Sequence, residues 1–500
     1  MKIFDCNTVH QETIHSDVCI VGAGPAGVTL ASKLADSGLD VIIVESGGKE
    51  FSKKANELNT LRVQSNFIYR DKESRRNRQI GGTANLWVGR VVPFRFDPVL
   101  DSEWGDLKDV VLPFYDDAFR LFGMKPGFAG ERANSDNELV AYWAHKTERF
   151  NAKSKIIKSY ENVRIFQFLT CVGSTDFTGD RIKTLAFVNQ KNERSVIQSR
   201  CFVFAMGAIE NARMLLIMKN QIQGRKDSFL KNAGKYVMDH PRVWHGTILN
   251  KSRSFLIDNY QLKSGNYGIC KSGIRNQPGE TRVYSNIMRS GNRATVWMNK
   301  ISVSSFQVSS KRLILRERGF LRMLANEMAR LPIIRKSDFL ENTLRGYFNR
   351  DSSPVYHLMT YCEQRPRYEN QLILAEERDR NGLQSPALIN NLHPDELSEV
   401  VNFFESLKKK ISDLGGVLEY NPEHLSQSAN YTDASHIMGG TRYSNQKEKA
   451  VVDKELNVMG IPNLFVTGSS VFPTSSVENP THLIVSLSCY LAEVLKGKFK

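Results

Sequence analysis

Residues 17–27 read DVCIVGAGPAG, and this stretch decides the fold. Residues 17–21 have the apolar composition of a buried strand. A glycine turn follows at once, and an alanine- and leucine-bearing helix runs on to about Ser37. Residues 41–44 (VIIV) then predict a second strand. Together these segments predict a βαβ unit of the kind that binds a dinucleotide.

The three glycines of this turn have separate tasks. Gly22 permits the tight turn, Gly24 lets the backbone approach a pyrophosphate, and Gly27 allows the helix to pack closely on the strand. Pro25 and Ala26 begin the helix, so we expect the phosphates at its N-terminus and include both residues in the cofactor site.

The acid that ends the second strand indicates which cofactor binds. Glu45, followed by Ser46, can accept hydrogen bonds from both ribose hydroxyls and would repel a 2′-phosphate, which disfavours NADP. Residues 201–208 (CFVFAMGA) predict a later strand that ends in a turn at Gly207. Residues 163–172 and 183–188 predict a β-meander, a connection rare in simple NAD dehydrogenases. FAD is therefore the predicted cofactor.

Composition limits the remaining possibilities. The chain has 500 residues, 41% of them hydrophobic, so it can bury a large core, and disorder, collagen and a small disulfide scaffold are excluded. A formal charge of +15 favours an anionic partner, but no nucleic-acid motif accompanies it. Seven cysteines without ligand spacing predict neither disulfides nor a metal site. Without a signal peptide or a long apolar stretch, we expect a cytoplasmic protein.

Along the chain, the pattern predicts two interleaved domains. The expected fold is α/β plus antiparallel sheet: a Rossmann-like FAD-binding domain, and a substrate domain built on an antiparallel sheet flanked by helices. The FAD-binding parts are expected at 1–110, 156–233 and 432–500, a lid or substrate-side insertion at 111–155, and the substrate domain at 234–431, from strand-like stretches such as 243–249, 266–274, 282–290 and 293–298.

Within the substrate domain, residues 311–350 combine a surplus of basic residues with a helical apolar pattern. Such a helix can lie on an anionic membrane, steer an acidic substrate, or simply pack its apolar stripe on the domain.

Several motifs in order resemble the glucose-methanol-choline (GMC) family of FAD oxidoreductases over nearly the whole chain. They are DVCIVGAGPAG (17–27), GGTANLWVGR (81–90), FAMGAIENAR (204–213), GKYVMDHPR (234–242), ENQLILAEERDRNG (369–382), HIMGGTRY (436–443) and GIPNLFVTGSSVFPTSSVENPT (460–481). The resemblance implies oxidation of an alcohol to a carbonyl, with hydride passing to flavin N5.

By position, the resemblance makes His436 the active-site base and Asn479 its partner, as in the branch similar to pyranose oxidases, cholesterol oxidases and sugar dehydrogenases. A histidine suits this work because hydride leaves a carbinol carbon more easily once a base shares the hydroxyl proton. The asparagine adds a fixed donor and acceptor. His482 lies where the family usually has an aliphatic residue, and we interpret it as a helix N-terminal residue rather than a second base.

The resemblance also implies further cofactor contacts. The loop past the pyrophosphate and under the isoalloxazine corresponds to Gly81, Gly82, Thr83, Asn85, Leu86 and Trp87. Some relatives attach FAD through a histidine just before the tryptophan, and here that position is Leu86, which predicts non-covalent FAD. Gly468 and Ser469 would meet the flavin phosphates and ribityl chain, and Val172 the adenine.

The leading hypothesis is therefore FAD-dependent oxidation of a sugar or polyol-like hydroxyl, by a dehydrogenase rather than an oxidase. Alternatives are another flavoprotein oxidase or monooxygenase, or a membrane- or partner-binding protein with a vestigial flavin fold. The sequence leaves open the substrate, the electron acceptor (oxygen, a quinone or a redox protein) and the oligomeric state.

Overall fold

The computed structural model describes residues 1–70, 75–87, 89–97, 99–124, 138–144, 150–160, 162–178, 180–221, 230–249, 270–275, 283–289, 355–413 and 415–499. The basic segment 311–350 and the strand-like stretch 293–298 lie outside these residues, so the expectations for them stay predictions. No helix in the described part of the chain is both long and apolar enough to cross a membrane.

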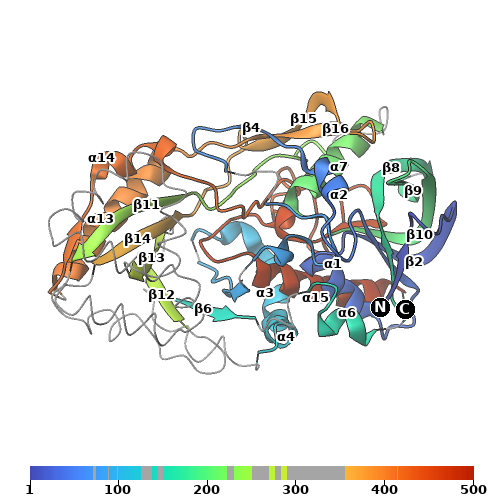
Figure 1. Ribbon diagram of the computed structural model, residues 1–500, viewed down its shortest axis with the longest axis horizontal. Coiled ribbons are helices and arrows are strands. Elements are labelled where there is room, and N and C mark those ends of the chain that lie inside the picture. The colour runs from blue at the N-terminus through green and yellow to red at the C-terminus, as the bar shows by residue number, and fades with distance from the viewer. Residues whose placement is uncertain are drawn as a thin grey trace, which may run out of the picture.

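The first sheet carries the predicted βαβ unit (Figure 1). Its strands, in spatial order, are β1 (Lys2–Asp5), β7 (Arg164–Gln167), β3 (Val41–Glu45), β2 (Thr13–Val21), β10 (Arg194–Phe204), β9 (Arg181–Asn189) and β8 (Leu169–Thr178), with β18 (Leu464–Val466) also paired to β10. β2 runs parallel to both β3 and β10, whereas β8, β9 and β10 form an antiparallel meander. The predicted strand pattern of this region is confirmed.

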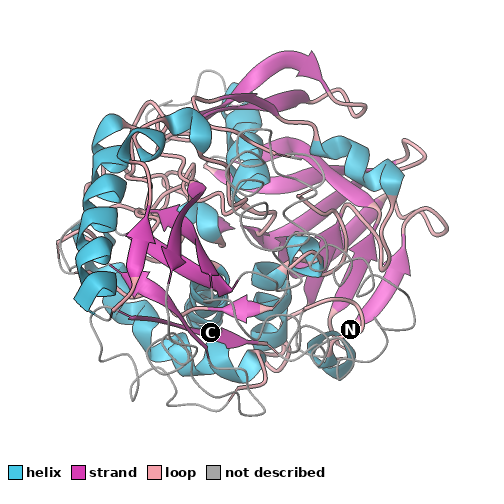
Figure 2. Cartoon of the chain, turned by 60° about the vertical axis from the view of Figure 1, so that its left-hand side comes forward, coloured by secondary structure: helices cyan, strands magenta, loops and turns pink. Residues whose placement is uncertain are grey.

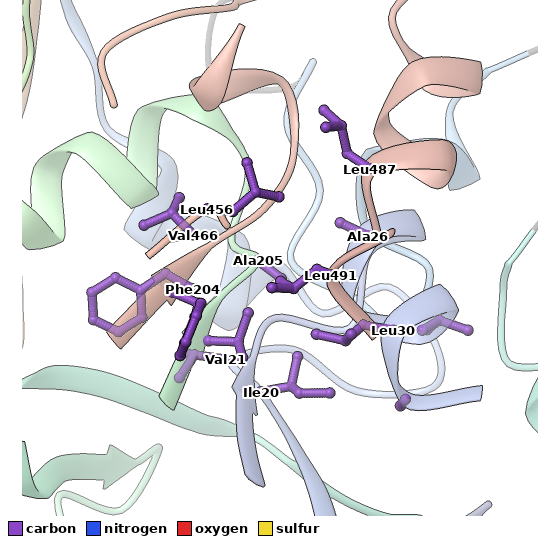
Figure 3. Packing of buried hydrophobic residues seen from close by; sticks show 14 of the residues in the cluster. Ile20, Val21, Ala26, Leu30, Phe204, Ala205, Leu456, Val466, Leu487 and Leu491 are labelled. Atoms are coloured by element: carbon purple, nitrogen blue, oxygen red, sulfur yellow. The ribbon is translucent and has the colours of Figure 1, made fainter. Parts of the chain in front are cut away.

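Helices α1 (Pro25–Leu34) and α15 (Thr481–Phe499) pack together beside this sheet. Figure 3 shows Leu487 and Leu491 of α15 beside Ala26 and Leu30 of α1, with Ile20 and Val21 of β2 close by. Small residues on α1 let the helices approach closely, and all these apolar side chains are buried. The C-terminal helix thus completes the core around the N-terminal βαβ unit.

A second sheet forms the other end of the molecule (Figures 1 and 2). Its strands are β17 (Val417–Glu419), β11 (Arg242–Leu249), β14 (Val355–Cys362), β13 (Val283–Arg289), β12 (Cys270–Arg275), β6 (Glu138–Trp143) and β5 (Arg90–Val91). All its pairings are antiparallel, as predicted. The long helix α13 (Pro394–Asp413) contributes Val400, Phe404 and Leu407 to the core beneath it.

Elements from distant parts of the chain join the two ends. A third, small sheet contains β15 (Gln371–Arg378), β16 (Gln384–Ile389) and β4 (Arg62–Gln64). It packs on α7 (Ala208–Gln221), which follows β10. The remaining described helices are α2 (Lys53–Asn56), α3 (Gly105–Val111), α4 (Tyr115–Leu121), α6 (Lys155–Ser159) and α14 (Pro422–Leu425). The predicted fold class, α/β with an added antiparallel sheet, is confirmed, while the exact domain boundaries stay predictions.

Candidate active site

The glycine turn between β2 and α1 leaves no room for a Cβ atom at two of its glycines. Gly22 has φ +108°, and a Cβ there would lie 2.5 Å from the Ala205 carbonyl oxygen. A Cβ on Gly27 would lie 2.0 Å from the Gly22 carbonyl oxygen. Both positions therefore require glycine, because no backbone atom can yield that far.

Gly24 differs from its neighbours, because a Cβ there would meet nothing within 4 Å. Gly24 is the N-cap of α1 and supplies no side-chain cap, and Pro25 follows at the first turn. The helix N-terminus thus faces open space without a capping side chain, as an anion site requires. This arrangement fits a pyrophosphate.

Glu45 ends β3 next to this turn, with its carboxylate buried. Its Oε2 accepts a hydrogen bond from the Ala23 backbone N–H at 2.9 Å, and its Oε1 accepts one from Gly47 at 2.8 Å. Burial raises the pKa of this carboxyl, although these backbone hydrogen bonds and Arg78 oppose the shift. Ser46 donates to Oε1 as well. Each carboxylate oxygen has two lone pairs, so Oε2 retains acceptor capacity for a ribose hydroxyl.

The loop at residues 81–87 runs against the glycine turn. Gly81 donates its N–H to the Ala23 carbonyl at 2.7 Å, and a Cβ on Gly82 would lie 3.1 Å from the Gly24 Cα. Asn85 braces the loop by donating from Nδ2 to the Ile80 and Gly82 carbonyls.

The side chains of Thr83, Leu86 and Trp87 in this loop differ in exposure and in hydrogen bonding. Thr83 accepts a hydrogen bond from the Asn77 backbone at 3.4 Å. Leu86 is 52% exposed, and the Trp87 Nε1 is a buried donor without a hydrogen-bond partner in the described part of the chain. The start of the loop, at Gly81 and Gly82, therefore borders the predicted cofactor site.

Other predicted cofactor residues lie at the ends or irregularities of strands. Val172 sits where the register of β8 against β9 shifts between Cys171 and Gly173, so a bulge interrupts the ladder there. Gly207 has φ +83° and open space at its Cβ position. Gly468 has φ +116°, and Ser469 donates its hydroxyl to the Ile437 carbonyl at 2.8 Å.

Asn211 on α7 is a residue to which the sequence analysis gave no role. Its Oδ1 accepts from the Met206 N–H, and its Nδ2 donates to the Thr467 carbonyl and the Ser470 hydroxyl. This fully buried amide ties the turn after β10 to the loop after β18. The ends of β2, β10 and β18 thereby meet at one edge, and the residues present fit FAD.

The two predicted catalytic residues lie side by side. The Nδ2 of Asn479 is 3.3 Å from the Nε2 of His436. His436 lies in the loop before β18, and Asn479 just precedes α15. Burial holds the pKa of His436 well below its ordinary value of 6.5, and nearby His240, Arg242, Arg90 and Arg75 act in the same direction. At neutral pH the ring is therefore a neutral imidazole that can accept a proton.

The sequence analysis missed two residues that hold His436 in place. His240 Nδ1 is 3.1 Å from His436 Nδ1. Asp239 accepts the backbone N–H of His436 at 2.9 Å and that of His240 at 2.7 Å, both at Oδ1. The motif GKYVMDHPR was a signal, since it places an acid and a histidine at the entrance to β11, but its spacing alone assigns them no task.

The backbone before His436 is unusual as well. Ser435 has φ +61°, a conformation that costs a non-glycine residue of order 1–3 kcal/mol. Its hydroxyl donates to Asp433 Oδ2 at 2.7 Å and accepts from Arg75 Nη1 at 3.2 Å. These contacts hold the turn that presents the His436 ring.

His482 takes the place expected for it, in the first turn of α15. Its ring lies among Tyr115, Phe119 and Phe122, with centroids 4.7, 4.5 and 6.4 Å away. Burial lowers its pKa to about 3, although the Tyr115 backbone opposes the shift. Neither ring nitrogen has a hydrogen-bond partner among the described residues. His482 is thus a packed core residue.

Comparison with known proteins agrees with this geometry. Residues 366–488 match the model of the GMC oxidoreductase family, and residues 15–60 match an FAD-binding domain. The first matched stretch contains His436 and Asn479, and the second contains the glycine turn.

Solved structures of formate oxidase share the fold. An arginine-to-alanine variant from Aspergillus oryzae, studied for its effect on FAD modification, gives a TM-score of 0.58 at 15% identity, covering 97% of this chain and 98% of that chain. The arginine-to-lysine variant gives 0.57 at 16% identity, covering 98% and 99%. Another formate oxidase structure gives 0.57 at 15% identity, again covering 98% and 99%.

The glycine turn and the two family matches indicate an FAD-dependent oxidoreductase, and the formate oxidase structures share its fold. Residues 366–488 match the GMC oxidoreductase family, as the sequence resemblance predicted.

Proposed function

We propose that this protein oxidises an alcohol group of a sugar or polyol-like substrate to a carbonyl, with His436 as the base that takes the hydroxyl proton. The observation that carries this proposal is the pairing of a half-buried, neutral His436 with Asn479 at 3.3 Å. Bound FAD supplies the hydride acceptor at flavin N5. The substrate carbon thus loses a hydride and its oxygen loses a proton, which accounts for both electrons.

The residues around the pair support this division of labour. Nε2 of His436 lies on the side of Asn479, so a substrate hydroxyl held by the amide would have the base within reach. Asn479 has no proton to take or give near neutral pH, so it orients the oxygen without competing for the proton. Arg75, Arg90 and Arg242, whose charges lower the pKa of His436, would also favour the negative charge that develops on the substrate oxygen.

We further propose that FAD is held without a covalent bond, because Leu86 offers no nucleophile for attachment. We propose a dehydrogenase rather than an oxidase, with oxygen, a quinone or a redox protein as the electron acceptor. Contact of residues 311–350 with an anionic partner belongs to the same proposal, and that segment lies outside the described residues.

The experiment mixes the purified, FAD-saturated protein anaerobically with glucose, galactose, glycerol, benzyl alcohol and formate, and follows the flavin absorbance. Bleaching by a sugar or polyol, with a carbonyl product identified by mass spectrometry, is the expected result. Bleaching by formate alone would replace alcohol oxidation with the activity named for the structural neighbours. No bleaching by any alcohol or sugar, with the flavin bound, would contradict the proposal.

The mode of attachment needs a separate test. Acid precipitation should release the flavin absorbance into the supernatant. Flavin that stays with the precipitate would show a covalent bond.

A further inference from the structure

The register of two chain segments brings His240 and His436 face to face. Met238 and Met438 exchange two backbone hydrogen bonds of 2.9 Å in an antiparallel bridge. In this register residue 240 lies opposite residue 436. The rings have centroids 5.2 Å apart at 85°, and their Nδ1 atoms are 3.1 Å apart. Only one of two facing Nδ1 atoms can carry the shared proton.

The contact of His240 Nε2 determines which of the two Nδ1 atoms carries the proton. Its Nε2 lies 3.1 Å from the Ser475 carbonyl oxygen, which can only accept a hydrogen bond. Nε2 of His240 therefore carries the proton of its neutral ring, and Nδ1 is left as an acceptor. It follows that His436 donates from Nδ1, and that its own Nε2 is unprotonated and has its lone pair toward Asn479 Nδ2.

The surroundings keep both rings neutral and fixed. His240 is fully buried, so a positive charge on its ring is disfavoured by burial. Its Nδ1 is 3.1 Å from the Nδ1 of His436, so charging both rings would add repulsion at short range. Asp239 holds the backbone N–H of both histidines with a single oxygen, Oδ1, which sets the spacing of the two rings. Asn479 Nδ2 faces the remaining nitrogen, His436 Nε2, at 3.3 Å.

We propose that His240 is a positioning residue: through the relay from the Ser475 carbonyl, it fixes the proton of His436 on Nδ1 and so makes Nε2 the base. The inference rests on the proposed function in that His436 acts on the substrate. The state of the His436 ring is nevertheless a property of the protein that needs no substrate to be observed.

The first test is therefore nitrogen NMR of the FAD-saturated protein with ¹⁵N-labelled histidine, with His436 assigned by its loss in His436→Asn. The expected spectrum has a protonated, pyrrole-type Nδ1 and an unprotonated, pyridine-type Nε2 on His436 at pH 8. A protonated Nε2 in the wild-type protein would overturn the inference, whatever the variants do.

The second test compares two substitutions at His240. Asn places an amide oxygen near the position of Nδ1 and can still accept from His436, whereas Leu accepts nothing. We expect His240→Leu to mix the two His436 tautomers in the spectrum. Its rate of flavin reduction by the best alcohol should fall about 10- to 100-fold with KM little changed. His240→Asn should restore most of both. Equal loss in both variants, with the His436 spectrum unchanged, would contradict a positioning role.

The matched control is His245→Asn, five residues further on the same chain segment. His245 accepts the Asn421 backbone N–H at 2.7 Å and stacks on His424, away from the catalytic pair. We expect it to leave the His436 signals and the rate unchanged. If no alcohol bleaches the flavin, the proposed function fails while the NMR result stands. If alcohols bleach it but Nε2 is protonated, only the inference fails.

Discussion

The glycine turn at 22–27 and the histidine junction at 239–240, 436 and 479 are built in different ways. In the turn, backbone atoms form the site, and the glycines are needed because they have no side chain. A Cβ on Gly27 or Gly22 would lie 2.0 or 2.5 Å from a carbonyl oxygen. At the junction, three side chains from distant segments meet through ring and amide nitrogens 3.1 and 3.3 Å apart.

This difference predicts which property a substitution in each region should change. The turn tolerates no added volume, so its substitutions should act on folding and on FAD binding. The junction depends on which atom carries a proton, so its substitutions should act on the rate of flavin reduction while FAD stays bound. Three predictions test this contrast, from the largest expected effect to the smallest, and a fourth concerns His482 in the core.

Gly27→Ala should have the largest effect. Its Cβ would lie 2.0 Å from the Gly22 carbonyl, and separating the helix from the strand costs about 1–3 kcal/mol or more out of a typical total of roughly 5–15. We expect a clear loss of thermal stability and of bound FAD. Gly497→Ala on α15, with open space at its Cβ position, is the control and should leave both unchanged. Normal stability of Gly27→Ala would contradict the packing argument.

Gly24→Val should separate FAD binding from folding. The position is extended, with φ −76° and ψ −176°, and its Cβ would enter open space, so the apoprotein should unfold at its usual temperature. Losing close backbone contact with a phosphate should weaken FAD binding on the order of tenfold to a hundredfold. Flavin fluorescence titration measures this. Unchanged FAD affinity would mean that the pyrophosphate lies elsewhere.

The pH dependence of flavin reduction should report the junction. His436 must be neutral to act as base, and its pKa is held well below its ordinary value of 6.5, so the step that its protonation causes should lie well below pH 6.5. Asp239 has a pKa raised to about 7 by burial and by Asp433, and could add a step there. Asp239→Asn should remove any step near 7. A step centred at 6.5 or above that survives in this variant would contradict a base that is neutral at pH 7 because its pKa is lowered.

His482→Leu should have the smallest effect, on acid stability alone. The folded protein keeps His482 neutral down to about pH 3, whereas the unfolded chain protonates it near 6.5. The wild type therefore loses stability as pH falls below 6.5, by about 2 kcal/mol at pH 5 from this residue. We expect the variant to lose less on acidification, with the rate unchanged. The same acid slope in both proteins would contradict this account.

Sequence could predict the first region because its rules are local. Gly22 to Gly27 and Glu45 follow one another at fixed intervals, and steric exclusion assigns each a task without knowledge of the rest of the chain. The β-meander and the terminal helix were also predicted, since their apolar patterns are continuous.

The junction could not be derived in the same way. His436 and Asn479 were identified through family resemblance, and the facing of His240 and His436 depends on a register set by Met238 and Met438 across about 200 residues. The bulge at Val172 and the positive φ of Ser435 likewise arise from tertiary contacts. No pattern along the chain reports any of these.

The most direct test of the central claim is the anaerobic rate of flavin reduction in His436→Ala compared with the wild type, with FAD saturating in both and the best alcohol as substrate. The account predicts an unchanged flavin spectrum and FAD affinity, and a rate about 10²- to 10⁴-fold lower, as expected for loss of a positioned base. A rate within about twofold of the wild type, measured with FAD fully bound, would contradict it.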